Sequence, residues 1–229
     1  MPGFKNTIRG NSITLKKSPR QQAYSQNRNL TARNERVFRA IKLLGRVLLT
    51  PFFRIEVAGA KYLPVDRAFI LLAKHHRWAD IPLLSIATPR PLYYIAKYEL
   101  FRNALSRWFY SALGGIPLNR QRPLASRHSL NATIDLLEKG EAVVIFPEGT
   151  YYRGQMGPGQ IGMVRFVLSR LKIPFIPVGI NYTASGWRVG VRIHFGKASF
   201  PEPASPLNPF FNDLMAQIAH LSGLPPNLR

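Results

Sequence analysis

Cysteine is absent from this chain of 229 residues, which excludes both disulfide bonds and thiolate metal sites. A chain without thiols fits a reducing compartment. Metal binding by other residues is not expected either, because His128, His194 and His220 are scattered without the spacing of a ligand set. The sequence therefore predicts no metal site.

Long apolar runs are also missing. No stretch reaches the roughly 18 consecutive apolar residues that a membrane-spanning helix needs. The beginning of the chain, residues 1–36, is polar and basic and lacks the apolar core of a secretory signal. We therefore expect neither a conventional integral membrane protein nor a secreted one. The length suits one domain with a sizeable core.

Acidic residues are scarce: 11 Asp and Glu stand against 32 Lys and Arg, which gives a net charge of +21. Such a charge attracts polyanions, which could be nucleic acid, an anionic membrane surface or an acidic partner protein. The excess is concentrated near the start. Residues 1–54 hold 12 of the basic residues and a single acid, Glu35.

Two segments precede the main domain. Residues 1–33 are polar and turn-rich, and we expect a flexible basic tail. Residues 34–54 show a helical period, with apolar residues opposite a basic arc. This pattern predicts an amphipathic helix lying in a membrane interface, although a surface helix docked on the domain's own core would show it too. The basic arc consists of Arg36, Arg39, Lys42 and Arg46.

Residues 55–229 alternate strand and helix patterns, which predicts an α/β domain with a mixed sheet flanked by helices. The expected strands cover 55–57, 69–73, 92–96, 142–146, 174–181 and 188–195. The expected helices cover 80–87, 99–112, 125–137, 162–171 and 208–221.

The stretch from Lys74 to Asp80 places two histidines near a carboxylate, the usual way to make a general base near neutral pH. On a regular helix His75 and Asp80 would lie about 140° apart, so they pair only if the chain turns between them. His76 and Asp80 form an i,i+4 pair that would meet on one helical face. Spacing alone leaves both histidines open, and a simple capping or surface pair is open as well.

Two further segments carry groups suited to a site. Glu148 follows the strand 142–146, and Gly149 beside it lets a ligand approach the backbone closely. Open α/β sheets place their sites at such strand ends, although a strand-ending turn explains the string equally well. Arg120 follows the short apolar run 115–118. Its guanidinium suits bidentate contact with phosphate, and a solvated charge is the simpler alternative.

Four segments, taken in order, resemble the blocks of the glycerolipid (lysophospholipid) acyltransferase family, whose type members are the bacterial 1-acylglycerol-3-phosphate acyltransferases. The resemblance runs from about Phe53 to Gly223, and four blocks in order are far more specific than any one of them. The blocks are His75-x4-Asp80, Gly115 to Arg120, Phe146-Pro147-Glu148-Gly149-Thr150 and Ile173 to Val178.

The resemblance implies transfer of a fatty acyl group from an acyl thioester to the hydroxyl of a lysophospholipid, above all 1-acyl-sn-glycerol-3-phosphate, giving phosphatidic acid. The thioester, acyl-CoA or acyl carrier protein, would be a co-substrate, and no cofactor is expected. His75 would be the general base, and Asp80 would fix its tautomer. The implied substrate-binding residues are Arg120, Glu148, Gly149, Thr150, Arg153 and Lys97.

The chain departs from the family pattern at two places in the first block. Family members commonly have Asn before the histidine and Ser two places after it, where this chain has Lys74 and Arg77. In the third block Tyr151 replaces the usual arginine, and Arg153 follows two residues later. The base, its carboxylate and the glutamate are intact, so these departures bear on the acceptor more than on the chemistry.

We therefore predict an acyltransferase bound to the cytoplasmic face of a membrane. Its partners would be an anionic membrane surface, a lysophospholipid and the acyl thioester, with no specific nucleic acid. Three alternatives remain open. A nucleic-acid-binding protein would explain the charge but not the four blocks. A non-catalytic membrane-binding relative, or an acyltransferase for a different lysolipid, would retain the blocks.

Overall fold

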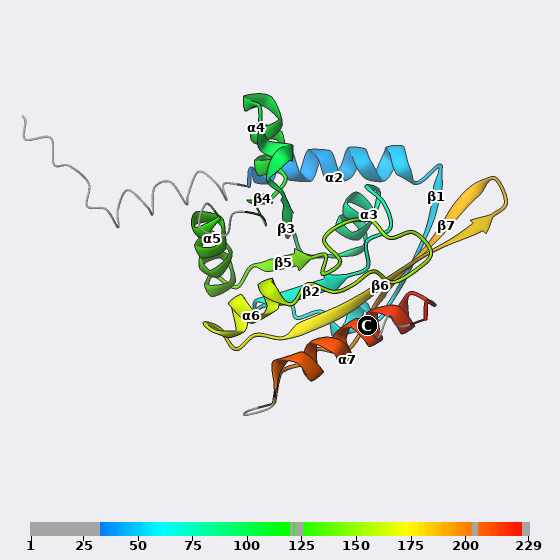
Figure 1. The fold of residues 1–229 in the computed structure, drawn as a ribbon. Coiled ribbons are helices and arrows are strands. Elements are labelled where there is room, and N and C mark those ends of the chain that lie inside the picture. The colour runs from blue at the N-terminus through cyan, green and yellow to red at the C-terminus, as the bar shows by residue number, and fades with distance from the viewer. Residues whose placement is uncertain (1–32, 120, 122–125, 203–205, 226–229) are drawn as a thin grey trace, which may run out of the picture.

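The centre of the molecule is a seven-stranded sheet, seen in a computed structural model that describes residues 33–119, 121, 126–202 and 206–225 (Figure 1). The strand order is β1-β7-β6-β2-β5-β3-β4, and all neighbours are parallel except the antiparallel pair β6 and β7. The predicted mixed sheet is confirmed. The strands are β1 (Phe53–Ala58), β2 (Phe69–Ala73), β3 (Leu92–Lys97), β4 (Gly115–Leu118), β5 (Ala142–Ile145), β6 (Phe175–Ser185) and β7 (Arg188–Phe195).

The central strands are apolar throughout because both faces of the sheet are covered. In β2, Ile70 and Leu72 pack into one core layer, while Phe69 and Leu71 pack into the other. Helices α2 (Glu35–Leu49) and α3 (Asp80–Ala87) lie over the second layer, above the sheet in Figure 1. The first layer is covered by α5 (Arg127–Glu138), α6 (Gly162–Leu168) and α7 (Leu207–Leu221).

Several element boundaries differ from those predicted. Strand β4 was expected only as a short apolar run, and it tolerates Pro117 because it is the edge strand of the sheet. The predicted helix 99–112 is divided into η2 (Tyr98–Phe101) and α4 (Ala104–Ala112), since the Asn103 side chain accepts from the Ser106 N–H and starts a new helix. Helix α2 ends at Leu49, and Phe53 already belongs to β1.

Helix α2 docks on the domain and yet exposes apolar residues. Phe38 is buried against the domain. Lys42, predicted to lie in the basic arc that meets lipid, instead turns inward, where its Nζ donates to the Thr88 carbonyl at 2.8 Å. The large apolar side chains that stay exposed on α2 are Leu43, Leu44, Val47 and Leu48. The docking alternative is therefore correct for one side of the helix and leaves the other side free.

The end of the predicted basic tail is tied down. Arg33 stacks its guanidinium over the Tyr93 ring at 4.5 Å and pairs with Glu35. Residues 1–32 lie outside the described part of the chain. Among the residues that are described, every helix is too short or too polar to cross a bilayer.

Strand register brings the two main motifs together. Leu72 of β2 pairs with Ile145 of β5 in a parallel ladder. His75 and Glu148 each follow three residues after these partners, so both emerge at the same edge of the sheet. This edge, at the carboxyl ends of β2 and β5, is where open α/β sheets form sites.

Candidate active site

The Asp80 carboxylate is the centre around which the chain turns after β2. It is fully buried, and its Oδ2 accepts from the backbone N–H groups of His76 at 2.6 Å and Arg77 at 2.7 Å. The same Oδ2 lies 2.9 Å from Nδ1 of His75, and Oδ1 accepts from the Tyr182 hydroxyl. Residues 74–79 are therefore a turn and not a helix. That turn is what the His75–Asp80 pairing required.

The Asp80 carboxyl group is ionised because its hydrogen bonds favour the anion. Burial alone would raise the pKa of Asp80, but hydrogen bonds from His75, Tyr182 and the Arg77 N–H outweigh burial and hold it below the usual value. An ionised carboxylate can only accept, so Nδ1 of His75 carries the proton. Nε2 of His75 is then left with a lone pair.

Two aromatic rings fix the plane of the His75 imidazole. Phe146 stacks on it with centroids 3.8 Å apart, and Tyr151 meets it edge-on at 4.4 Å. The His75 side chain retains 10% exposure. Within the described residues, Nε2 of His75 makes no hydrogen bond to the protein, so this atom is the one free to meet a ligand.

His76 points elsewhere. Its Nε2 lies 2.8 Å from the Ile180 carbonyl, which makes it the donor, and its ring packs edge-on against Tyr182. Burial and the nearby Lys74 cation lower the pKa of His76, so it stays neutral. The structure thus decides between the two histidines, since only His75 joins Asp80 through its side chain.

A buried ion pair joins the two loops of the site. Nζ of Lys74 lies 2.9 and 2.8 Å from the two carboxylate oxygens of Glu148, and it also donates to the Tyr152 carbonyl at 2.7 Å. Both side chains are 0% exposed. Burial lowers the pKa of Lys74, and the contact with Glu148 opposes that shift. The loop after β2 is thereby locked to the loop after β5.

The position of Glu148 does not favour the head-group contact expected from the sequence. Besides Lys74, its oxygens accept from the His75 N–H at 3.0 Å and the Gly157 N–H at 2.6 Å. A carboxylate enclosed in this way holds the backbone of His75, and its side chain is 0% exposed. Gly149 completes the loop, and its φ of 72° makes a tight turn that other residues adopt with strain.

The other expected binding residues surround this centre less closely. Thr150, Arg153 and Lys97 are exposed on the loop after β5 and at the end of β3. Arg120 lies outside the described residues. Their contact with substrate stays a prediction.

Tyr182 and Arg77 complete the site, and of these only Arg77 stands out in the sequence, as a departure from the family pattern. The Tyr182 hydroxyl of β6 donates to Asp80, which stands 102 residues earlier in the chain, and no local sequence pattern predicts this hydrogen bond. The Arg77 guanidinium lies over the Tyr182 ring at 4.0 Å, and its Nε is enclosed without a hydrogen-bond partner among the described residues. Both contacts depend on β6 pairing beside β2.

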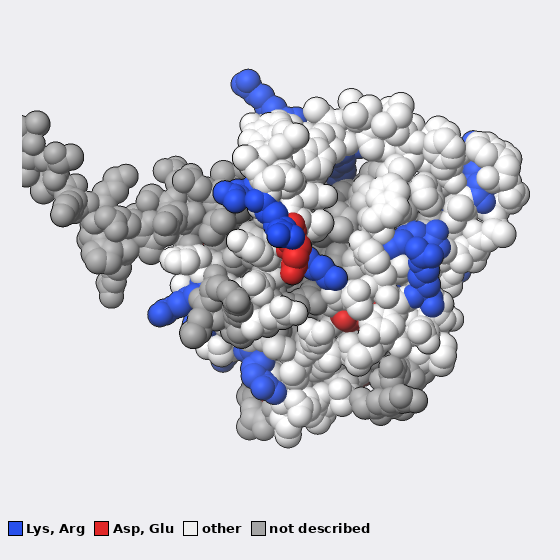
Figure 2. All heavy atoms as spheres, turned by 45° about the horizontal axis from the view of Figure 1, so that its top comes forward, with Lys and Arg blue, Asp and Glu red and all other residues white. Residues whose placement is uncertain are grey.

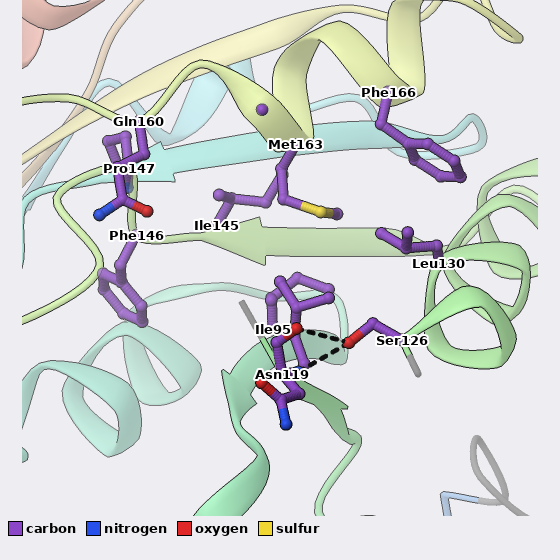
Figure 3. A pocket seen from close by; sticks show the side chains of 12 residues that line it. Ile95, Asn119, Ser126, Leu130, Ile145, Phe146, Pro147, Gln160, Met163 and Phe166 are labelled. Atoms are coloured by element: carbon purple, nitrogen blue, oxygen red, sulfur yellow. Dashed lines mark hydrogen bonds between the residues drawn. The ribbon is translucent and has the colours of Figure 1, made fainter. Parts of the chain in front are cut away.

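An apolar cavity of about 340 Å³ is lined in part by Phe146, the ring that stacks on His75 (Figure 3). Met163 and Phe166 of α6 point into it, as do Leu130 of α5 and Ile95 of β3. Polar groups are few: Ser126 Oγ and the Asn119 backbone exchange two hydrogen bonds of 2.8 Å, and Gln160 lies beside Pro147, away from them. The site therefore combines a histidine–carboxylate pair with an apolar compartment, which is the usual make-up of a small-molecule enzyme site.

No group of three or more His, Cys, Asp or Glu residues in the described parts of the chain is arranged to hold a metal ion. The site as it stands consists of a histidine–carboxylate pair at the strand ends, which defines the class as an α/β enzyme capable of acid–base chemistry.

Comparison with known proteins identifies the family. Residues 54–181 match the family described as Acyltransferase. A 1-acyl-sn-glycerol-3-phosphate acyltransferase of Bacillus subtilis is 30% identical over 149 residues, covering 62% of this chain and 69% of the relative. The chain therefore belongs to the acyltransferase family of glycerolipid enzymes, as its four sequence blocks predict.

Three further similar proteins are also acyltransferases by name. A chloroplastic 1-acyl-sn-glycerol-3-phosphate acyltransferase of Brassica napus is 29% identical, over 62% of this chain but only 41% of the relative. A lyso-ornithine lipid O-acyltransferase of Pseudomonas aeruginosa is 27% identical over 62% of this chain and 53% of the relative. The crystal structure of the 1-acyl-sn-glycerophosphate acyltransferase PlsC from Thermotoga maritima shares the fold, with a TM-score of 0.65 and 22% identity over 88% of this chain and 87% of that one.

The buried ion pair generates a stability prediction. We expect Lys74→Met to lower the free energy of unfolding by about 3–5 kcal/mol, because Glu148 is left as an uncompensated buried charge. Lys74→Met combined with Glu148→Gln should be less destabilised, since no lone charge remains. Urea denaturation measures both. Arg192→Met, which breaks the exposed Arg192–Glu56 pair, is the control and should cost about 1 kcal/mol or less. A single variant as stable as the double variant would contradict this account.

The pH dependence of stability in acid should reveal the lowered pKa of Asp80. The pKa of Asp80 is lower in the folded chain than in the unfolded one, so its ionisation stabilises the fold above about pH 4 and that contribution fades as the pH falls through the folded pKa. We expect the free energy of unfolding to fall less steeply below about pH 4 in Asp80→Asn than in the wild type. Equal slopes in a pH series of urea melts would show that the Asp80 pKa is not depressed.

Proposed function

We propose that this enzyme transfers a fatty acyl group from an acyl thioester to 1-acyl-sn-glycerol-3-phosphate, giving phosphatidic acid, with His75 as general base. The observation that carries the proposal is the His75–Asp80 pair, which holds the imidazole through Nδ1 and leaves Nε2 without a hydrogen bond to the described residues. The Phe146 ring stacked on this imidazole also lines the apolar cavity. The names of the Bacillus subtilis and Brassica napus relatives support the acceptor. Phospholipid biosynthesis is the context those names give.

In the proposed reaction, His75 is the group that takes up the proton and later returns it. Nε2 of His75 takes the proton from the acceptor hydroxyl while the hydroxyl oxygen attacks the thioester carbonyl. Asp80 stabilises the imidazolium that forms, as the carboxylate does in a serine-protease triad. When the carbon–sulfur bond breaks, the imidazolium returns the proton to the thiolate, and an ester and a free thiol result. The nucleophile is the substrate's own hydroxyl, so no Ser or Cys nucleophile is needed.

The cavity behind Phe146 suits the acyl chain. Its walls are apolar side chains, and each buried methylene of a chain contributes about 0.8 kcal/mol. Because Phe146 both lines the cavity and stacks on His75, a chain lying there would place its thioester close to the imidazole. The donor, acyl-CoA or acyl carrier protein, is left to experiment.

The acceptor and the charge of the chain both point to an anionic membrane surface, and we propose that α2 lies on its cytoplasmic face. Leu43, Leu44, Val47 and Leu48 form an exposed apolar side of α2, and exposed Arg36, Arg39 and Arg46 belong to the same helix. Figure 2 turns this side of the molecule forward and shows more basic than acidic side chains on it. Each cation near an anionic surface adds about 1 kcal/mol of attraction.

A second acceptor has one specific observation in its favour. The Pseudomonas aeruginosa relative acylates lyso-ornithine lipid by its name, and Arg77 in this chain stands where the family commonly has Ser. Lyso-ornithine lipid therefore belongs beside lysophosphatidic acid in the acceptor test.

The first test of the proposal is acyl transfer by histidine variants. We expect His75→Ala to lose at least about 100-fold in kcat, because general-base catalysis contributes about 10²–10⁴-fold. His76→Ala should keep most of the activity, since its imidazole faces Ile180. Labelled acyl-CoA and acyl carrier protein are offered separately to lysophosphatidic acid and lyso-ornithine lipid. A His75→Ala enzyme as active as wild type would overturn the assignment, and an active enzyme that accepts only lyso-ornithine lipid would overturn the acceptor.

We expect Met163 to set the preferred length of the acyl chain, because its side chain points into the cavity. Met163→Trp should fill part of the space and shift the preferred donor to shorter chains, whereas Met163→Ala should shift it to longer ones. Competition between donors of different length, read by mass spectrometry of the products, measures the shift. Identical product distributions for both variants would place the acyl chain outside this cavity.

A further inference from the structure

Helix α4 carries its apolar side outward. Leu105, Trp108 and Phe109 follow the i, i+3, i+4 spacing of one helical stripe, and they are 76%, 58% and 38% exposed. The other side faces the domain, where Tyr110 is half-buried and Arg107 Nε donates to the Phe101 carbonyl at 3.3 Å. An amphipathic helix in a water-soluble domain normally buries its apolar stripe. This reversed arrangement calls for an apolar phase outside the protein.

The same side of the molecule carries further exposed apolar groups. Helix α4 rises beside the amino-terminal end of α2, above the sheet in Figure 1, and the Asn34 N–H donates to the Ala112 carbonyl between them. Trp78, in the turn between His75 and Asp80, is 64% exposed. Tyr98 and Leu100 of η2, next to α4, are also exposed. Exposed apolar side chains are therefore present on α2, on α4 and in the Trp78 turn.

Two of the exposed aromatic side chains lie beside His75. Tyr151, which is 50% exposed, packs edge-on against the imidazole at 4.4 Å. Trp78, which is 64% exposed, follows His75 by three residues in the same turn. A bilayer that receives Trp78 therefore lies close to His75.

We propose that α4 is a second membrane-insertion element, whose Leu105–Trp108–Phe109 stripe enters an anionic bilayer together with Trp78. The inference rests on the proposed acylation of a membrane lipid. Helix α2 lies along the surface and α4 penetrates it, so the two fix the tilt of the domain and bring His75 to the depth of the lysolipid hydroxyl.

A bilayer fits this surface better than a protein partner does. Trp is enriched at the boundary between acyl chains and water, and Trp78 and Trp108 are both exposed. Exposed Arg102, two residues before α4, suits anionic head groups. Helix α2, which meets α4 at the Asn34–Ala112 hydrogen bond, adds exposed apolar residues and exposed arginines.

Vesicle binding of the full chain tests the proposal. We expect Leu105→Ser combined with Trp108→Ser to weaken partitioning into phosphatidylcholine–phosphatidylglycerol vesicles by about tenfold or more, because two large apolar side chains no longer leave water. Val65→Ser is the matched control: Val65 is 84% exposed but precedes β2, at the opposite end of the strand from His75, and its loss should change nothing. Wild-type partitioning by the α4 variant would overturn the proposal.

Acyl-transfer rates test the membrane role of α4 separately from the proposed reaction. With a short-chain, water-soluble lysophosphatidic acid, the α4 variant should match the wild-type rate, whereas with vesicle-embedded acceptor it should be slower. A tenfold binding loss with no turnover by either protein would retain the membrane role of α4 and overturn the acyl-transfer proposal. Equal rates on vesicle-embedded acceptor would show that α4 does not position the site.

Tryptophan fluorescence provides a measurement that needs no destabilising variant. The chain has three tryptophans, so Trp78→Phe combined with Trp187→Phe leaves Trp108 as the only emitter. Its emission should shift to shorter wavelength on vesicle binding and be quenched by lipids brominated in their acyl chains. An unshifted, unquenched signal from vesicle-bound protein would overturn insertion. So would a lipid-free dimer that the α4 substitutions convert to monomer, because the stripe would then be a contact between two copies.

Discussion

The Lys74–Glu148 ion pair connects the end of β2 to the loop after β5, and Glu148 also accepts from the backbone N–H of His75. Moving two charges out of water is costly, and an apolar pair of similar volume can be as stable. Here the pair is surrounded by partners: Lys74 also donates to the His75 and Tyr152 carbonyls, and Glu148 also accepts from the His75 and Gly157 N–H groups. Apolar replacements would leave those backbone groups unsatisfied. The pair thus gives two loops a single relative position.

Asp80 imposes a second constraint within that frame. Its carboxylate accepts two backbone N–H groups, the Tyr182 hydroxyl and Nδ1 of His75, so one side chain shapes the turn and selects the histidine tautomer. Four residues between His75 and Asp80 are enough for the chain to wrap around the carboxylate. The family spacing is therefore a property of the turn and cannot be understood from helix geometry.

The molecule departs in two ways from the usual distribution of polarity. Lys74 and Glu148 are enclosed within the site, while large apolar side chains on α2 and α4 face outward. Exposing such apolar groups to water costs free energy that burial elsewhere must offset. Binding to the proposed membrane surface would recover this free energy. The basic composition adds attraction at longer range.

The sequence by itself determined the elements with a strong local signal. The apolar runs of β2 and β5 identified buried strands, since only strands covered on both faces are apolar at every position, and the order of four short blocks identified the family. Local pattern did not divide 99–112 into two helices or find the edge strand β4, because Asn103 acts through one cap and Pro117 depends on its place in the sheet. Only the tertiary structure decided between His75 and His76, enclosed Glu148, brought Tyr182 to Asp80 and turned Lys42 inward and the α4 stripe outward. Those outcomes depend on which strands are neighbours and which helix faces meet, and such contacts join residues too distant in the chain for any local pattern to encode.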